Sequence, residues 1–284
     1  MPKEKSSAAL IPGIIDMPTE NISSNPTTIS TINILPFEAK REIYKNLVPE
    51  EIYSRFNLSP DLYDLEGRDL ILLKSDPGQS DVEIFIFHQS GFSDPVLYGH
   101  ITDTLFGQIH ILLYVINNPD SQRFNIDRMA DGTPTLLGAV TRNIDEELLA
   151  FQNGLSPGQV RHGMRLMVSG ARKFEEFVQS LGHTIYFVEP LYYHNAVLFE
   201  RYGFAYQRGR NLMEEINEGF QPKGHLTKLL DASTPFRSPN AGNSIRKRSW
   251  AIHDGILNKP FSGVTMYKRV GIGAELNTSQ NCDW

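Results

Sequence analysis

The sequence predicts an α+β fold, with a mixed and mostly antiparallel sheet flanked by helices in a single domain. Residues 69–117 contain four runs rich in β-branched and aromatic residues, separated by turn clusters such as Asp76-Pro77-Gly78. After them, apolar residues from Val160 to Leu181 recur at steps of four and three, which is typical of one helical stripe. Because more strand-like runs follow that helix, we expect one parallel crossover through it within the sheet.

The N-terminal region divides into a tail and three short elements. Residues 1–31 are rich in Ser, Thr, Asn and Pro, and their weak periodicity predicts a flexible tail. The run 32–35 predicts a short strand, and the apolar spacing of 37–47 predicts a helix. Pro49 suits the first turn of a second helix, "PEEIYSRF".

The middle of the chain predicts an antiparallel meander and one long helix. A further short strand is expected within 133–140, and a short helix over 144–151 ends at Asn153-Gly154. Ser156 is the expected N-cap of the long helix, Pro157 its first residue, and Gly182 its end. The four strands of the meander are expected at 69–75, 82–89, 95–104 and 107–117.

The remainder predicts a strand–helix–strand unit, an insertion and a last strand. The strand 183–189 is followed by a helix over 193–202, capped by Gly203. The chain therefore divides into a core at 32–209, an insertion at 210–262 with short helices, and a final segment at 263–284. A strand at 204–209 closes the core, and the final segment contains a strand at 263–270.

Composition narrows the class of protein. The chain has 284 residues and a net charge of −6, so it lacks the basic excess of a nucleic-acid binder. Its single cysteine, Cys282, excludes a disulfide framework and favours a reducing compartment. Apolar runs such as "ILLYVI" fall far short of the roughly 20 residues of a membrane helix. We therefore expect a cytoplasmic protein with neither nucleic acid nor a membrane as its partner.

Two stretches carry a resemblance to a known family. "VEPLYYHNAVLFERYGF" closes on Phe199-Glu200-Arg201-Tyr202-Gly203-Phe204, which is similar to a "Y-E-x-x-G-F" ending, and Pro157 precedes Gly163 by six residues. With the order of the elements, these stretches make residues 32–209 and 263–270 resemble the GNAT (GCN5-related N-acetyltransferase) superfamily. The resemblance implies transfer of an acetyl or short acyl group from acetyl-CoA or another acyl-CoA to an amine.

The expected cofactor site lies at the start of the long helix. Helix N-termini carry unpaired backbone N–H groups and a partial positive charge, which suit a pyrophosphate. The sequence departs from the family's pattern at Val160, where the family has Gln or Arg, and at Arg165, where the family has a small residue. The cofactor-binding candidates are Gly158, Gln159, Val160, Arg161, His162, Gly163 and, on the later helix, Asn195.

The catalytic candidates lie on strands and at the start of the later helix. Many members of the family use a tyrosine to protonate the leaving thiolate, but Phe199 stands at that position, so Tyr192 and Tyr193 are the substitutes. The amine must also lose a proton, which His100 or Glu189 would take. Strand alternation places His100 and Thr102 on one face and Asp103 on the other, and it leaves the face of His110 open.

Other functions remain open at this stage. The chain could be a non-catalytic acyl-CoA-binding or protein-interaction module of the same fold. A metalloenzyme is a further alternative because the chain has eight histidines, although none shows a tight helical H-x-x-x-H spacing. The acceptor is either a small-molecule or a peptide amine, and a homodimer is left open. Residues 234–257 are expected to cover the acceptor side and to shape substrate choice.

Overall fold

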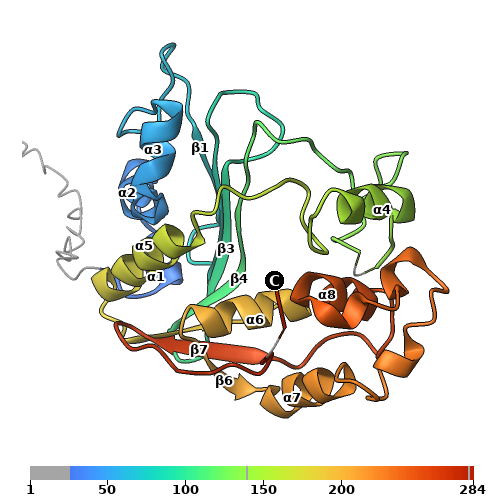
Figure 1. The fold of residues 1–284 in the computed structure, drawn as a ribbon. Helices are drawn as coiled ribbons and strands as arrows, with labels where there is room; N and C mark the ends of the chain where they lie inside the picture. Colours follow the sequence, from blue (N-terminus) through green and yellow to red (C-terminus); the bar gives the residue numbers. More distant parts are fainter. Residues whose placement is uncertain (1–25, 139, 281) are drawn as a thin grey trace, which may run out of the picture.

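The computed structural model describes residues 26–138, 140–280 and 282–284. Seven strands within them form one sheet, and Figure 1 shows α2 and α3 on one side of its first strands and α4 and α8 on the other. The strands are β1 Ile71–Lys74, β2 Asp81–Ile86, β3 Leu97–Asp103, β4 Ile109–Ile116, β5 Ile185–Val188, β6 Ala205–Arg208 and β7 Thr265–Arg269. The α-helices are α1 Ile29–Asn33, α2 Phe37–Tyr44, α3 Glu50–Phe56, α4 Ile144–Gln152, α5 Met167–Ser180, α6 Tyr193–Arg201, α7 Arg210–Gly219 and α8 Ile245–His253.

The sheet confirms the predicted α+β class and its mostly antiparallel character. Its strand order is β1-β2-β3-β4-β5-β7-β6, and β4 and β5 are its one parallel pair among the described strands. The connection from β4 to β5 contains α5, as the crossover prediction required. The predicted strands of the meander, and those around 183–189, 204–209 and 263–270, are confirmed within a few residues at their ends.

Two apolar clusters hold the fold together. The main core joins one face of the sheet to α1, α2, α5 and α6, and α7 and α8 from the predicted insertion also contribute to it. Met213 and Ile252 illustrate the contribution of these two helices, because both are buried in that core. A second group, here called the Trp250 cluster, consists of Phe124, Ile126, Ala150, Leu155, Phe236 and Trp250. It ties the connection after β4 to the segment before β7.

The predicted strand at 32–35 is wrong, because α1 occupies Ile29–Asn33. Thr28 and Thr31 form a capping box, and the Asp103 carboxylate accepts from the backbone N–H groups of Ile29 at 2.7 Å and Ser30 at 2.9 Å. These bonds satisfy the donors at the helix start. The predicted tail lies outside the described residues as far as residue 25, but its last residues, 29–31, belong to this helix.

The predicted start of the long helix at Ser156 is also wrong. The helix begins at Met167, with Leu166 as its N-cap, and residues 155–166 run as an irregular loop. Gly158 and Arg165 adopt positive φ angles of 80° and 61°, which an α-helix does not contain. Val160, the first member of the predicted stripe, packs against the Trp250 cluster instead of the main core.

The predicted short strand within 133–140 is absent from the described residues of that segment. An isolated bridge joins Arg128 to Pro134, and turns follow in which Leu136 and Leu137 have φ angles of 51° and 56°. Left-handed backbone at two successive leucines prevents an extended strand. Ala139 lies outside the described residues.

Gly203, which follows α6, provides a test of close packing. Its φ is 81°, and a Cβ there would lie 2.7 Å from the Gly273 Cα. We expect Gly203→Ala to lower the free energy of unfolding by about 2–4 kcal/mol, through left-handed strain and overpacking together. Gly182→Ala is the matched control, because its φ is 82° and nothing lies within 4 Å of the added Cβ. Equal losses in urea titrations of the two variants would contradict the packing argument.

Candidate functional site

The parallel pair of strands separates at a defined point. Pairing between β4 and β5 ends at Ile111 and Val188, whereas β4 continues to Ile116 beside β3. The register with β3 shifts at the same place, because His100 faces Leu113 and Ile101 faces Ile111. Leu112 is therefore the extra residue of a β-bulge. Bulges of this kind bend a strand and often lie next to functional sites; we call this place the β4–β5 fork.

An exposed loop with free backbone donors runs beside the end of β4. Asn118 N–H donates to the His162 carbonyl at 2.8 Å, and a Cβ on Gly163 would lie 3.3 Å from the Ile116 carbonyl. No described residue accepts a hydrogen bond from the backbone N–H groups of residues 162–166, and α5 begins at the next residue. Arg165 is exposed and forms no ion pair within the described residues. Free amides, a helix N-terminus and a cation together suit an anion.

The predicted cofactor residues divide between this loop and structural roles. His162 and Gly163 are exposed in the loop, and Gly158 approaches the Tyr192 ring so closely that a side chain would not fit. Arg161 has a structural role: it donates to Asp94 at 2.9 Å and to the carbonyls of Pro119 and Ser121. The remaining three occupy other places: Gln159 Oε1 accepts from Ser156 N–H, Val160 packs on the Trp250 cluster, and Asn195 is half-buried in the first turn of α6.

A groove and a small apolar pocket lie between α5 and α6. The groove, of about 670 Å³, is lined among others by Arg172 and Arg201. Phe199 lines the apolar pocket together with Tyr114, whose buried hydroxyl has no partner among the described residues. Burial raises the pKa of Tyr114. No local pattern in the sequence indicates this tyrosine, because it lies in an ordinary apolar strand.

The two tyrosines at the start of α6 have different environments. The Tyr192 hydroxyl donates to the Leu137 carbonyl, so its proton is already in a hydrogen bond. Tyr193 is 1% exposed, and burial raises its pKa to about 12 against the opposing charge of Arg248. Its hydroxyl has no hydrogen-bond partner among the described residues, because Arg248 donates instead to Gly242 and Asn217.

The polar residues of the strands gather on the face opposite the main core. The register confirms that His100 and Thr102 share a face, while Asp103 binds α1 on the other. His100 Nε2 lies 3.4 Å from Asp81 Oδ2. His110 pairs with Thr102 and therefore shares this face, near Glu189. Burial lowers the pKa of His110, and the charge of exposed Glu189 partly offsets that effect.

A pocket that the sequence did not indicate lies beside the start of α6. It measures about 500 Å³, and we call it the α6–α8 pocket; its lining includes Leu136, Leu191, Tyr192, Ser249, His253 and Phe261. His253 Nε2 lies 3.0 Å from Glu147 Oε1, and Glu147 also accepts from Arg142 Nε at 2.9 Å. Glu147 and His253 are 106 positions apart, so no spacing pattern could have joined them.

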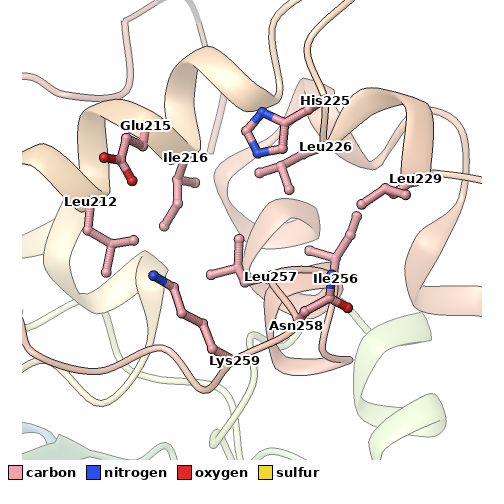
Figure 2. A pocket seen from close by; sticks show the side chains of 10 residues that line it. All are labelled: Leu212, Glu215, Ile216, His225, Leu226, Leu229, Ile256, Leu257, Asn258 and Lys259. Carbon is pink, nitrogen blue, oxygen red and sulfur yellow. The ribbon is translucent and has the colours of Figure 1, made fainter.

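Two further features adjoin this pocket, a buried histidine that contacts its Ser249 and a second pocket. His194 Nδ1 lies 2.8 Å from Ser249 Oγ, and burial lowers the pKa of His194 to about 3, so its ring is neutral. A second pocket of about 330 Å³, lined by Leu212, Glu215 and Leu257, adjoins at Asn258 and Lys259 (Figure 2). Figure 2 shows Lys259 extending along this second pocket.

Neither a metal-binding cluster nor a membrane span is found among the described residues. There, no group of three or more His, Cys, Asp and Glu side chains is arranged to hold a metal ion. None of the helices in residues 26–138, 140–280 and 282–284 is long and apolar enough to span a membrane.

Comparison with known proteins gives no relative. No protein-family model matches the chain, and searches of curated proteins and of solved structures give no match.

Proposed function

We propose that the chain transfers an acetyl or short acyl group from acyl-CoA to an amine. The carrying observation is the β4–β5 fork, which lies beside a loop with unpaired amides at residues 162–166. The resemblance to the GNAT superfamily implies that acceptor and thioester meet where two central strands separate. The fork is the one parallel pair of the described sheet and separates after three residue pairs.

In this proposal the loop holds the pyrophosphate and the fork holds the thioester. The amides of 162–166 and the N-terminus of α5 supply donors, and Arg165 supplies a positive charge. The groove between α5 and α6, with Arg172 and Arg201, accommodates the adenosine end. The amine nitrogen attacks the thioester carbon directly, so that a C–N bond forms, the C–S bond breaks and the thiolate leaves.

Arg165 tests the position of the pyrophosphate. We expect Arg165→Glu to raise the dissociation constant for acetyl-CoA about tenfold, which corresponds to 1.4 kcal/mol. The effect should shrink at high salt, because exposed charges are screened. Calorimetric titration at two ionic strengths measures both expectations. Arg208→Glu is the control, because it makes the same change of charge at an exposed residue of β6, away from the loop. Equal weakening by both variants would remove the loop from the proposal.

A non-catalytic acyl-CoA-binding module is the second candidate. Phe199 has no hydroxyl, and the Tyr192 proton is held by Leu137, so neither residue is ready to protonate a thiolate. Thiol release measured with a mixture of amines separates the two functions. Binding of acetyl-CoA without any release of thiol would favour the module.

A further inference from the structure

The α6–α8 pocket is built from segments that are distant in sequence. Leu136 and Gly138 come from the connection after β4, Tyr192 from the start of α6, and His253 from the end of α8. Tyr192 also borders Gly158, which lies in the irregular loop 155–166, and Leu191 lies three residues beyond the last residue of β5. The pocket therefore opens next to the β4–β5 fork, and its volume of about 500 Å³ suits a small molecule.

One wall of the pocket is held in strained backbone. Positive φ angles occur at three successive residues, Leu136, Leu137 and Gly138. The Tyr192 hydroxyl donates a hydrogen bond to the carbonyl of Leu137. Left-handed backbone costs about 1–2 kcal/mol for each residue with a side chain. Such strain persists only where the surroundings impose it, and it concentrates at ligand sites.

His253 is oriented as a proton acceptor at this wall. A carboxylate only accepts hydrogen bonds, so the Nε2 atom that faces Glu147 carries the proton and Nδ1 keeps a lone pair. No described residue bonds to that Nδ1. A Cβ on Gly138 would lie 2.7 Å from His253 Cε1, so this glycine leaves room for the ring. Glu147 is 2% exposed, and its contact with Nε2 holds the imidazole in this orientation.

Resting on the proposed acyl transfer, we propose that the α6–α8 pocket binds the acceptor and that His253 Nδ1 takes the amine proton. The acceptor is a small primary amine with an aromatic or branched apolar body and a carboxylate. Its nitrogen forms the C–N bond, the C–S bond breaks, the amine proton passes to Nδ1, and the thiolate takes a proton from solvent. His253 then returns its proton to solvent.

The charges of the pocket select this class of acceptor. Lys259 lies at its edge, and no carboxylate belongs to its lining within the described residues. Lys259 is exposed, forms no ion pair with a described residue and belongs to the lining of both pockets. It extends along the second pocket in Figure 2, so its side chain turns toward the α6–α8 pocket to meet an anionic substituent. A nearby cation also lowers the pKa of a bound amine and favours the neutral, nucleophilic form. Polycationic amines fit this environment poorly.

The first experiment compares acceptors. We expect kcat/KM for phenylalanine to exceed that for 2-phenylethylamine about tenfold, and spermidine to react least; the tenfold ratio corresponds to 1.4 kcal/mol. Lys259→Ala should bring the ratio of the first two to about one, whereas Lys228→Ala, an exposed lysine outside the pocket, should preserve it. An unchanged ratio in Lys259→Ala overturns the assignment of the acceptor class. Circular dichroism of each variant verifies its folding.

The second experiment compares two candidate bases. We expect His253→Asn to lower kcat on the order of 100-fold, in the range of general base catalysis. Phenylalanine should still bind this variant in the absence of acyl-CoA, and ligand-observed NMR measures this binding. A larger loss in His110→Asn than in His253→Asn overturns the role of His253.

The two proposals fail in different ways. If phenylalanine binds and Lys259→Ala weakens it, but no amine releases thiol from acyl-CoA, the pocket assignment stands and the transferase proposal fails. If thiol is released with phenylalanine but neither Lys259→Ala nor His253→Asn alters the kinetics, the transferase proposal stands and this pocket is not its acceptor site.

Discussion

Trp250→Ala should lower the free energy of unfolding by about 3–5 kcal/mol, the range for removal of a buried tryptophan. Trp250 has no solvent exposure and stacks on Phe236 with a centroid distance of 5.0 Å. Its Nε1 donates to the Leu155 carbonyl at 2.8 Å, and this acceptor would be left unpaired. Because the Trp250 cluster joins the two segments that frame the α6–α8 pocket, acceptor binding should weaken together with stability.

Urea titration followed by circular dichroism measures this loss. Trp250→Phe is the control, because it keeps an aromatic ring beside Phe236 and removes only the hydrogen bond and part of the volume. It should lose roughly 1–2 kcal/mol, near the cost of one unpaired buried acceptor. A loss below 1 kcal/mol in Trp250→Ala would mean that the cluster does not contribute to global stability. A separate early transition would mean that it unfolds independently of the sheet.

The strands could be predicted because their burial alternates as the sequence does. β2 alternates half-buried and buried residues over its whole length, which is the period-two pattern of a sheet with one covered face. The helix α6 could also be predicted from the sequence, because Gly203, which has a positive φ, marks its end. In these elements the local pattern and the tertiary environment agree.

The errors arise where distant contacts decide the conformation. The residues around α1 are rich in isoleucine and threonine, which favour a strand, but Asp103 lies 74 positions away and binds the start of a helix there. The apolar stripe from Val160 continues into α5 in sequence, although Val160 and α5 pack against different clusters. A helical period alone cannot show which core each apolar residue joins.

The candidate site was predicted only in part for the same reason. The sequence indicated the loop near Gly163 and the tyrosines of α6, and the structure brings Gly158 into contact with Tyr192. The α6–α8 pocket depends on Glu147 and His253, which have no common motif. Lining residues from remote segments become visible only when the fold assembles them.

Glu147→Gln should cause the second large loss of stability. It should lower the free energy of unfolding by about 3–5 kcal/mol at neutral pH, as expected when one partner of a buried ion pair is removed. Glu147 is 2% exposed and accepts from both His253 and Arg142. A glutamine retains an oxygen for His253 but leaves the partly buried guanidinium of Arg142 with Asp254 alone. Asp145→Asn is the control, since it removes the same charge from an exposed position in the first turn of α4. It should lose at most about 1 kcal/mol, the contribution of a charge to a helix dipole.

The pH dependence of this loss identifies the ionised carboxylate as its source. Burial alone would raise the pKa of Glu147, but the hydrogen bonds from His253 and Arg142 outweigh it, and the pKa lies below 4.5. A group whose pKa is lowered in the folded state stabilises fully above its unfolded pKa, and this contribution fades as the pH falls through the folded value. The contribution of the Glu147 carboxylate to the difference in unfolding free energy between the native chain and Glu147→Gln should therefore be present in full above the unfolded pKa of glutamate, about 4.3, and shrink as the pH falls below it. Chemical denaturation at pH 7, 5 and 3 measures this difference. A gap that stays constant down to pH 3 would assign the loss to packing and not to the charge that holds His253.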